Sequence, residues 1–133
     1  MKLIGKKYKV NKNKNLKDSF LHAYEGINYA ITKERNMHIH VAFSVVVIAA
    51  GAFFRISYCE WLICLGLIGL VISLEMINTA IEAIVDMITT KEDPNAKVAK
   101  DTAAGAVLVS SCISALIGFA IFLPKIFEFL MNL

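Results

Sequence analysis

Apolar residues follow two patterns along this chain, a helical stripe near the start and three long runs after it. The stripe repeats every three or four positions, which is the spacing of one helix face; it consists of Leu16, Phe20, Tyr24, Ile27 and Ile31. The runs lie at about 36–56, 60–88 and 100–123. Each approaches or reaches the roughly 20 residues that a helix needs to cross a bilayer. We therefore predict an amphipathic helix over about 16–34, lying on a membrane surface, and three transmembrane helices.

Composition supports this fold class, an all-α integral membrane protein. The chain is 57% hydrophobic with a mean hydropathy of +0.61, which is too apolar for an ordinary small soluble domain. The three cysteines, Cys59, Cys64 and Cys112, have no metal-ligand or disulfide-type spacing, and we interpret them as small apolar side chains. We expect one membrane domain over 16–133, preceded by a basic, flexible segment over 1–15.

The lysines predict the orientation. Residues 1–17 hold seven lysines and no acid, whereas the turn at 55–60 holds only Arg55. A basic block can bind nucleic acid or an anionic membrane, and the apolar runs that follow favour the membrane, with no nucleic-acid partner. The loop at 89–101 carries three more lysines. The positive-inside rule then places the N-terminus and this loop in the cytoplasm and the C-terminus outside.

Four polar residues interrupt the second run, and we call them the polar seam: Glu75, Asn78, Glu82 and Asp86. At about 100° per residue they fall within roughly 80° of one helix face. A seam of this kind can join helices by hydrogen bonds. Acids on one seam repel each other unless a cation lies between them, which suits Mg²⁺ or a proton or cation pathway.

Further candidate residues flank the other two runs. Glu34 precedes the first run, and Lys100 and Asp101 lie at the start of the third, so both groups can meet the seam at one membrane face. Neither a Walker A motif nor a glycine-rich kinase loop is present in the sequence. We interpret His38 and His40 as interfacial packing or headgroup contacts, since residues two apart on a helix do not face each other.

Two motifs carry a resemblance to a known family. "EMINTAIEAIVD" (75–86) and "AKDTAAGAVL" (99–108), joined by a short loop, resemble the prokaryotic diacylglycerol kinase and undecaprenol kinase family of small membrane lipid kinases. The order of surface helix and three spans matches this family as well. The resemblance implies a bacterial plasma-membrane enzyme that uses ATP and Mg²⁺, and a homotrimer whose sites are shared between subunits.

The resemblance also implies residue roles. Glu75 matches the catalytic base, and Glu34 and Glu82 match the metal ligands, although "TKERN" has Lys33 where the family more often has Asn. Asn78 and Asp86 would support the site, and Ala104 would lie near the lipid headgroup together with Glu75. The positions that match nucleotide contacts are Glu34, Glu82, Lys91, Glu92, Asp93, Lys100, Asp101 and, on the surface helix, His22.

The lipid itself is the least determined part of the prediction. Ala104 cannot form a hydrogen bond through its side chain, the surface helix has few arginines, and the Lys/Asn/Ile-rich composition is similar to that of the Gram-positive branch. These features favour undecaprenol as the substrate, with diacylglycerol as the alternative. A competing interpretation from another class is a non-enzymatic membrane oligomer or ion pathway built around the same acids.

Overall fold

The computed structural model describes residues 15–132, and this part of the chain contains helices and no strand. The basic segment expected over 1–15 lies outside the described residues except for Asn15. The helices are α1 (Leu16–Lys33), α2 (Arg35–Phe53), α3 (Tyr58–Ile88) and α4 (Pro94–Met131). Three of them, α2, α3 and α4, are long and apolar enough to cross a membrane. The prediction of an all-α membrane protein is confirmed.

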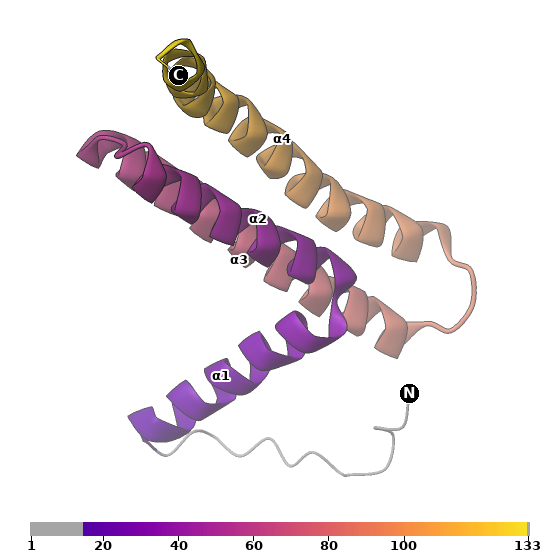
Figure 1. Cartoon of the computed structure of the whole chain (residues 1–133). Helices are drawn as coiled ribbons and strands as arrows, with labels where there is room; N and C mark the ends of the chain where they lie inside the picture. The colour runs from indigo at the N-terminus through magenta and orange to yellow at the C-terminus, as the bar shows by residue number, and fades with distance from the viewer. Residues whose placement is uncertain (1–14, 133) are drawn as a thin grey trace.

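Helices α2, α3 and α4 alternate in direction along the bundle, and this determines which helix ends lie next to each other. Figure 1 shows the α1–α2 junction, the end of α3 and the start of α4 at one end of the bundle, and the α2–α3 turn and the C-terminus at the other. The seam and the candidate residues that flank the other runs belong to the first end. Antiparallel topology therefore gathers residues from separate parts of the sequence at one end, as it does for Asp86 of α3 and Lys100 of α4.

Helix α1 diverges from the bundle (Figure 1). It ends where Glu34 adopts an extended backbone conformation, with φ −94° and ψ 119°. The other described residues leave much of its apolar stripe uncovered, since the five stripe side chains are between 40% and 78% exposed. An exposed apolar face next to a membrane-spanning helix is the arrangement of an interfacial helix. Its position on the membrane surface stays a prediction.

A tight turn joins α2 to α3. Ile56 N–H donates to Gly51 O (3.1 Å) and Arg55 N–H to Ala52 O (3.4 Å), the pair of bonds that defines a Schellman motif. Arg55 takes the left-handed position, with φ 48°, where glycine is the usual residue. Gly51 is needed for the close approach, since a Cβ there would lie 2.9 Å from the Trp61 ring.

Side-chain caps begin the two long helices after their turns. Ser57 and Glu60 form a capping box at the start of α3: Ser57 N–H donates to Glu60 Oε2 (2.7 Å), and Glu60 N–H donates to Ser57 Oγ (3.3 Å). At the start of α4, Asp93 Oδ1 accepts from the N–H groups of Asn95 and Ala96. Pro94 follows this cap as the first helical residue, where its missing N–H costs nothing. The loop between α3 and α4 is thus held at the end where α4 begins.

Helix α4 continues beyond the expected end of the third span near 123. It passes Pro124 and ends at Met131. Pro124 is tolerated because neighbouring contacts hold the last turns in place. Lys125 Nζ lies 2.9 Å from Glu60 Oε1, and the Phe129 ring packs against Phe53 and Phe54 with centroids 5.5 and 6.2 Å apart. The last turns of α4 therefore cover the α2–α3 turn.

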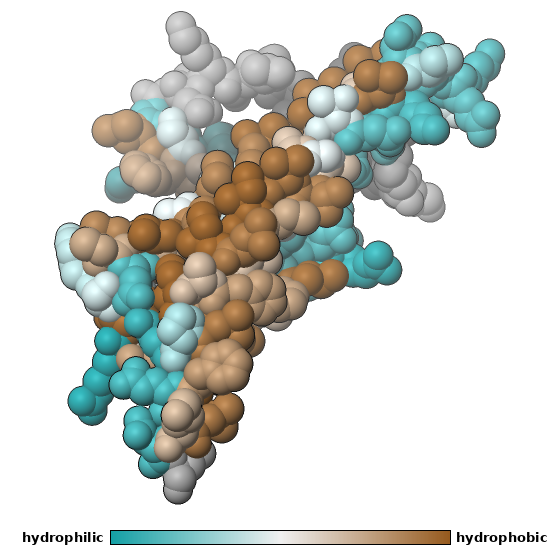
Figure 2. All heavy atoms as spheres, turned by 90° about the horizontal axis from the view of Figure 1, so that it is seen from above, coloured by the Kyte–Doolittle hydropathy of each residue, from teal (hydrophilic) through white to brown (hydrophobic). Residues whose placement is uncertain are grey.

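Little apolar surface is buried within the chain itself. Among the described residues, the buried apolar side chains are Ala30, Met37, Ile56, Cys64, Val71 and Val107. Figure 2 shows apolar residues over the middle of the helices and hydrophilic residues gathered towards the ends. Close approach of helices at Gly66, Gly69, Gly105 and Gly118 does not occur within the chain, since a Cβ at each would meet nothing within 4 Å. Lipid or further copies of the chain must cover these faces.

Candidate active site

The polar seam of α3 runs from the interior of the bundle to its surface. Glu75 is 1% exposed and Asn78 is 5% exposed. Glu82, about two turns further on, is half-buried, and Asp86 is exposed. The helical spacing that suggested the seam therefore places its first acid where water has the least access.

Hydrogen bonds connect the seam along α3 and across to α4. Asn78 Nδ2 donates to Glu82 Oε1 over 3.0 Å. Lys100 Nζ, on α4, donates to Asp86 Oδ1 over 2.6 Å, and Glu82 is a further electrostatic neighbour of Lys100. The structure thus brings Lys100 to the seam within one chain. One cation faces two acids near the solvent end of the seam.

Glu75 has a different environment at the buried end. Neither of its carboxylate oxygens has a hydrogen-bond partner among the residues that the structure describes. Its electrostatic neighbours are His40, Glu34 and Glu82, and Asn36 also borders it. An unpaired carboxylate buried next to two other acids is expensive to maintain in a membrane protein. Its oxygens are available to accept a proton or a hydrogen bond from a ligand.

Glu34 and Glu82 offer oxygen ligands of the kind that Mg²⁺ prefers. Glu34 lies between α1 and α2 and Glu82 on α3, both half-buried, and both act on Glu75. Within 15–132 no group of three or more His, Cys, Asp or Glu side chains is close enough to hold a metal by itself. Mg²⁺ is commonly held by one or two carboxylates together with substrate phosphates and water. A site completed by a nucleotide fits this pair of acids.

The remaining candidates make other contacts. His22 Nδ1 lies 3.3 Å from Glu25 Oε2 on the exposed face of α1. Lys91 and Glu92 are exposed in the α3–α4 loop, and Asp93 caps α4. Asp101 and Ala104 are exposed on the first turns of α4. No hydrogen bond or ion pair joins these six residues to the seam in the described part of the chain.

Sequence reasoning missed the contribution of α2 to the site. His40 Nε2 lies 4.0 Å from Glu75 Oε2, so this ring faces the seam rather than the membrane interface. A signal was present: Asn36, His40 and Ser44 are spaced four apart and so form a polar stripe on one helix face. Thr79 was missed as well. Its hydroxyl donates to Glu75 O over 3.0 Å, so the backbone satisfies the Thr79 hydroxyl.

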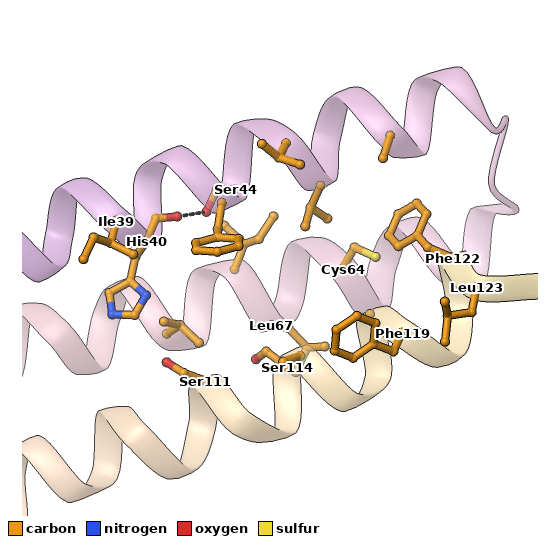
Figure 3. A pocket seen from close by; sticks show the side chains of 18 of the residues that line it. Ile39, His40, Ser44, Cys64, Leu67, Ser111, Ser114, Phe119, Phe122 and Leu123 are labelled. Atoms are coloured by element: carbon orange, nitrogen blue, oxygen red, sulfur yellow. Dashed lines mark hydrogen bonds between the residues drawn. The ribbon is translucent and has the colours of Figure 1, made fainter. Parts of the chain in front are cut away.

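An apolar cavity of about 620 Å³ lies between α2, α3 and α4 and reaches His40 (Figure 3). Hydroxyl groups line it, but Ser44 donates to His40 O (2.7 Å) and Ser114 to Ser110 O (2.8 Å). Ser111 Oγ is buried and has no hydrogen-bond partner within residues 15–132. His40 and Ser111 lie at one end of the cavity, while Phe119, Phe122 and other apolar side chains form the rest.

A second cavity, of about 490 Å³, lies between α3 and α4. Asn78 borders it together with apolar residues of both helices. Asn78 Oδ1 has no hydrogen-bond partner among the described residues. Open space therefore borders the seam at Asn78, between α3 and α4, whereas the first cavity is lined by His40 of α2 and by no seam residue.

Comparison with known proteins gives consistent matches over most of the chain. The family described as prokaryotic diacylglycerol kinase matches residues 21–122. The chain is 50% identical over 108 residues to the undecaprenol kinase of Bacillus subtilis, covering 81% of this chain and 88% of that relative. It is 34% identical over 118 residues to the diacylglycerol kinase of Synechocystis sp., covering 88% of this chain and 67% of that relative.

Proposed function

The chain belongs to the prokaryotic diacylglycerol kinase family, and we propose that the polar seam is the active site at which it phosphorylates undecaprenol. It is a bacterial membrane lipid kinase, and the kinase family implies ATP as the phosphate donor. The observation that carries the proposed site is the buried Glu75 carboxylate with two unpartnered oxygens. A non-enzymatic oligomer or ion pathway has no comparable support, because the relatives are kinases.

Glu75 acts as the general base in this proposal. Its carboxylate accepts the proton of the lipid hydroxyl as the hydroxyl oxygen forms a bond to the γ-phosphorus of ATP. The bond between that phosphorus and the β–γ bridging oxygen breaks, and ADP leaves. Phosphoryl transfer depends mainly on in-line positioning and charge neutralisation. A rigid helix supplies the positioning, since Glu75 lies in the middle of α3.

Glu34 and Glu82 would hold Mg²⁺ in the proposed site. When bound, the ion would neutralise charge on the ATP phosphates. Asn78 supports this arrangement, since its amide fixes the Glu82 carboxylate through the 3.0 Å hydrogen bond. With one oxygen of Glu82 held by Asn78, the other remains available as a ligand.

The nucleotide occupies the polar end of the bundle in this proposal. Lys100 supplies a positive charge to the phosphates after release from Asp86, its partner at 2.6 Å. The exposed side chains of Lys91, Glu92 and Asp101 belong to this end and contact the nucleotide in this proposal, and His22 would reach it from α1. Asp93 contributes chiefly by capping α4, which fixes the loop that carries its neighbours.

Undecaprenol fits the apolar cavity better than diacylglycerol does. The two ester groups of diacylglycerol need hydrogen-bond donors when they leave water. The cavity offers few, because two of its serine hydroxyls are already bonded to backbone carbonyls. An isoprenoid alcohol needs polar partners at one end alone, and His40 and Ser111 are at one end (Figure 3). The name of the Bacillus relative supports the same lipid.

We propose a homotrimer with the N-terminus in the cytoplasm and the C-terminus outside. Exposed apolar side chains on α2, α3 and α4 provide surface that other copies and lipid can cover. Asp101 and Ala104 are exposed within the chain, and a neighbouring subunit's seam is where they can act. The lysines of the N-terminal segment and of the loop at 89–101 support the orientation.

The activity is tested with purified protein in lipid micelles containing Mg·ATP. ADP release is measured with undecaprenol, with diacylglycerol and without added lipid, all in the same micelles. We expect lipid-dependent ADP release with a higher kcat/KM for undecaprenol. A clear preference for diacylglycerol would overturn the choice of lipid and leave the kinase site unaffected. Absence of release with either lipid would contradict the proposed reaction.

A further inference from the structure

His40 and Glu75 face each other across the α2–α3 interface, with Nε2 and Oε2 4.0 Å apart. We infer that His40 is a positioning residue for Glu75. Its Nε2–H donates a hydrogen bond to Oε2, which orients the carboxylate and leaves Oε1 free to accept the proton of the lipid hydroxyl. The inference rests on the proposed function, in which Glu75 is the base, but the contact itself can be tested without turnover.

Burial makes Glu75 dependent on such a partner. The Glu75 side chain is 1% exposed, and water is therefore a poor substitute for a protein donor. Of its electrostatic neighbours, Glu34 and Glu82 are acids, and His40 is the side chain that can carry a positive charge. An ionised carboxylate in this position is favoured by a nearby donor and disfavoured by nearby acids. His40 thus opposes two repulsive neighbours.

The geometry of α2 directs the His40 ring towards α3. Met37, one turn before His40, is 1% exposed and anchors this part of α2 in the bundle. The Ser44 hydroxyl donates to His40 O over 2.7 Å, which holds the next turn. At 4.0 Å the two atoms are beyond hydrogen-bond distance, and hydrogen bonds in ligand-free active sites often tighten only when substrate binds.

The ring also borders the space proposed for the lipid. The His40 side chain is 18% exposed, and it lines the apolar cavity at the end that includes Ser111 (Figure 3). One side of the imidazole can therefore contact Glu75 while another borders the ligand. Filling the cavity with a lipid would exclude water and strengthen the hydrogen bond to the carboxylate. Arrival of the substrate would then complete the orientation of the base.

The first test uses NMR of selectively ¹⁵N-histidine-labelled protein in micelles. The chain has three histidines, so the ring signals are few, and the His40 signal is identified by its loss in His40→Gln. We expect Glu75→Gln to move the His40 ring signals and to leave those of His38 in place, because His38 is exposed on another face of α2. A His40 signal that does not move in Glu75→Gln would overturn the inference.

The second test separates orientation of the base from binding. We expect His40→Ala to lower kcat roughly 10- to 100-fold, the value of a hydrogen bond to a charged group. The KM for Mg·ATP should stay within about twofold, because His40 does not reach the nucleotide end. His40→Gln should recover part of kcat, since its amide can donate to Oε2. His38→Ala is the matched control and should behave as the unmodified enzyme does.

The outcomes distinguish this inference from the function on which it rests. Loss of turnover in Glu75→Gln, combined with full turnover in His40→Ala, overturns the role of His40 and leaves Glu75 as the base. Full turnover in Glu75→Gln overturns the base and the positioning role together. A raised KM for Mg·ATP in His40→Ala with unchanged kcat also contradicts the inference, since it indicates a binding role.

Discussion

Replacement of Glu75 by Gln should abolish most of the activity while leaving the protein at least as stable. Gln has nearly the same shape as Glu, so the packing of α3 against α2 is preserved. The substitution removes the proton-accepting group and the negative charge together. Most substitutions of a buried residue lower activity by unfolding the protein, and for Glu75 we expect the two effects to have opposite signs.

The size of each effect follows from the burial of the side chain. A general base contributes roughly 10²- to 10⁴-fold to the rate, or about 3–5 kcal/mol of activation free energy at about 1.4 kcal/mol per factor of ten. The Glu75 carboxylate is 1% exposed with no hydrogen-bond partner in the described chain. A buried unsatisfied polar group costs roughly 1–3 kcal/mol, more if it is charged. Neutralising it should therefore not lower the free energy of unfolding.

Two measurements in the same micelles check this. Lipid-dependent ADP release gives kcat and KM, and nucleotide binding is measured by calorimetry in the absence of lipid. Stability is measured by heating samples and determining the fraction that stays monodisperse on size-exclusion chromatography. The control is Glu128→Gln, the same substitution at an exposed position near the end of α4. It should change neither activity nor heat resistance.

Two results would refute this reasoning. If Glu75→Gln retained near-full turnover, the base would be another group. If it lost turnover and also aggregated at a lower temperature than Glu128→Gln, Glu75 would be an acid that holds α2 and α3 together, and its loss of activity would say nothing about catalysis. Unchanged nucleotide affinity with a large fall in kcat is the result that supports a base, because a base acts in the transition state rather than in ground-state binding.

Three further substitutions test other parts of the structure. Glu82→Gln should abolish turnover and raise the Mg²⁺ concentration for half-maximal activity, because a hard anionic ligand is lost; an unchanged Mg²⁺ requirement contradicts this. Lys100→Ala should raise the KM for ATP roughly tenfold or more, whereas Lys97→Ala, which removes an exposed lysine of the same helix, should not; equal effects would indicate only a loss of positive charge. Arg55→Gly should stabilise the turn by up to about 1 kcal/mol, because Arg55 has φ 48°, and should therefore raise the temperature at which the protein aggregates. A lower aggregation temperature would show that the Arg side chain stabilises the turn.

The helices were predictable because each carries a strong local signal. The apolar runs are long, and the stripe of α1 repeats with the helical period, so element types follow from the sequence. The end of α4 did not follow, because Pro124 is a helix breaker in most local contexts. Its continuation depends on the Lys125–Glu60 ion pair and on aromatic packing against α2. These contacts join residues that are distant in sequence.

The seam was predictable for the same reason, and its partners were only partly so. Four polar residues on one face of an apolar helix can be recognised from the rotation of about 100° per residue along the helix. His40 was missed because it was interpreted together with His38, which lies two residues away on another face. Its helical neighbours at a spacing of four, Asn36 and Ser44, form the polar stripe to which it belongs. The Lys100–Asp86 ion pair depends on how α4 packs along α3, which no local pattern specifies. The lipid and nucleotide roles of the other residues stay predictions.

The scarcity of buried apolar side chains bears on how such a chain can change over generations. A soluble domain of this length is constrained mainly by its interior, where exchanging one aliphatic residue for another leaves a void or a clash. Here most aliphatic positions of the three long helices are exposed within the chain. Hydrocarbon is fluid and adapts to whichever aliphatic side chain it meets, so drift among Leu, Ile, Val and Phe should be nearly neutral at lipid-facing positions. Purifying selection should concentrate on a few polar side chains and on Gly51, where the Trp61 ring leaves no room for a methyl group.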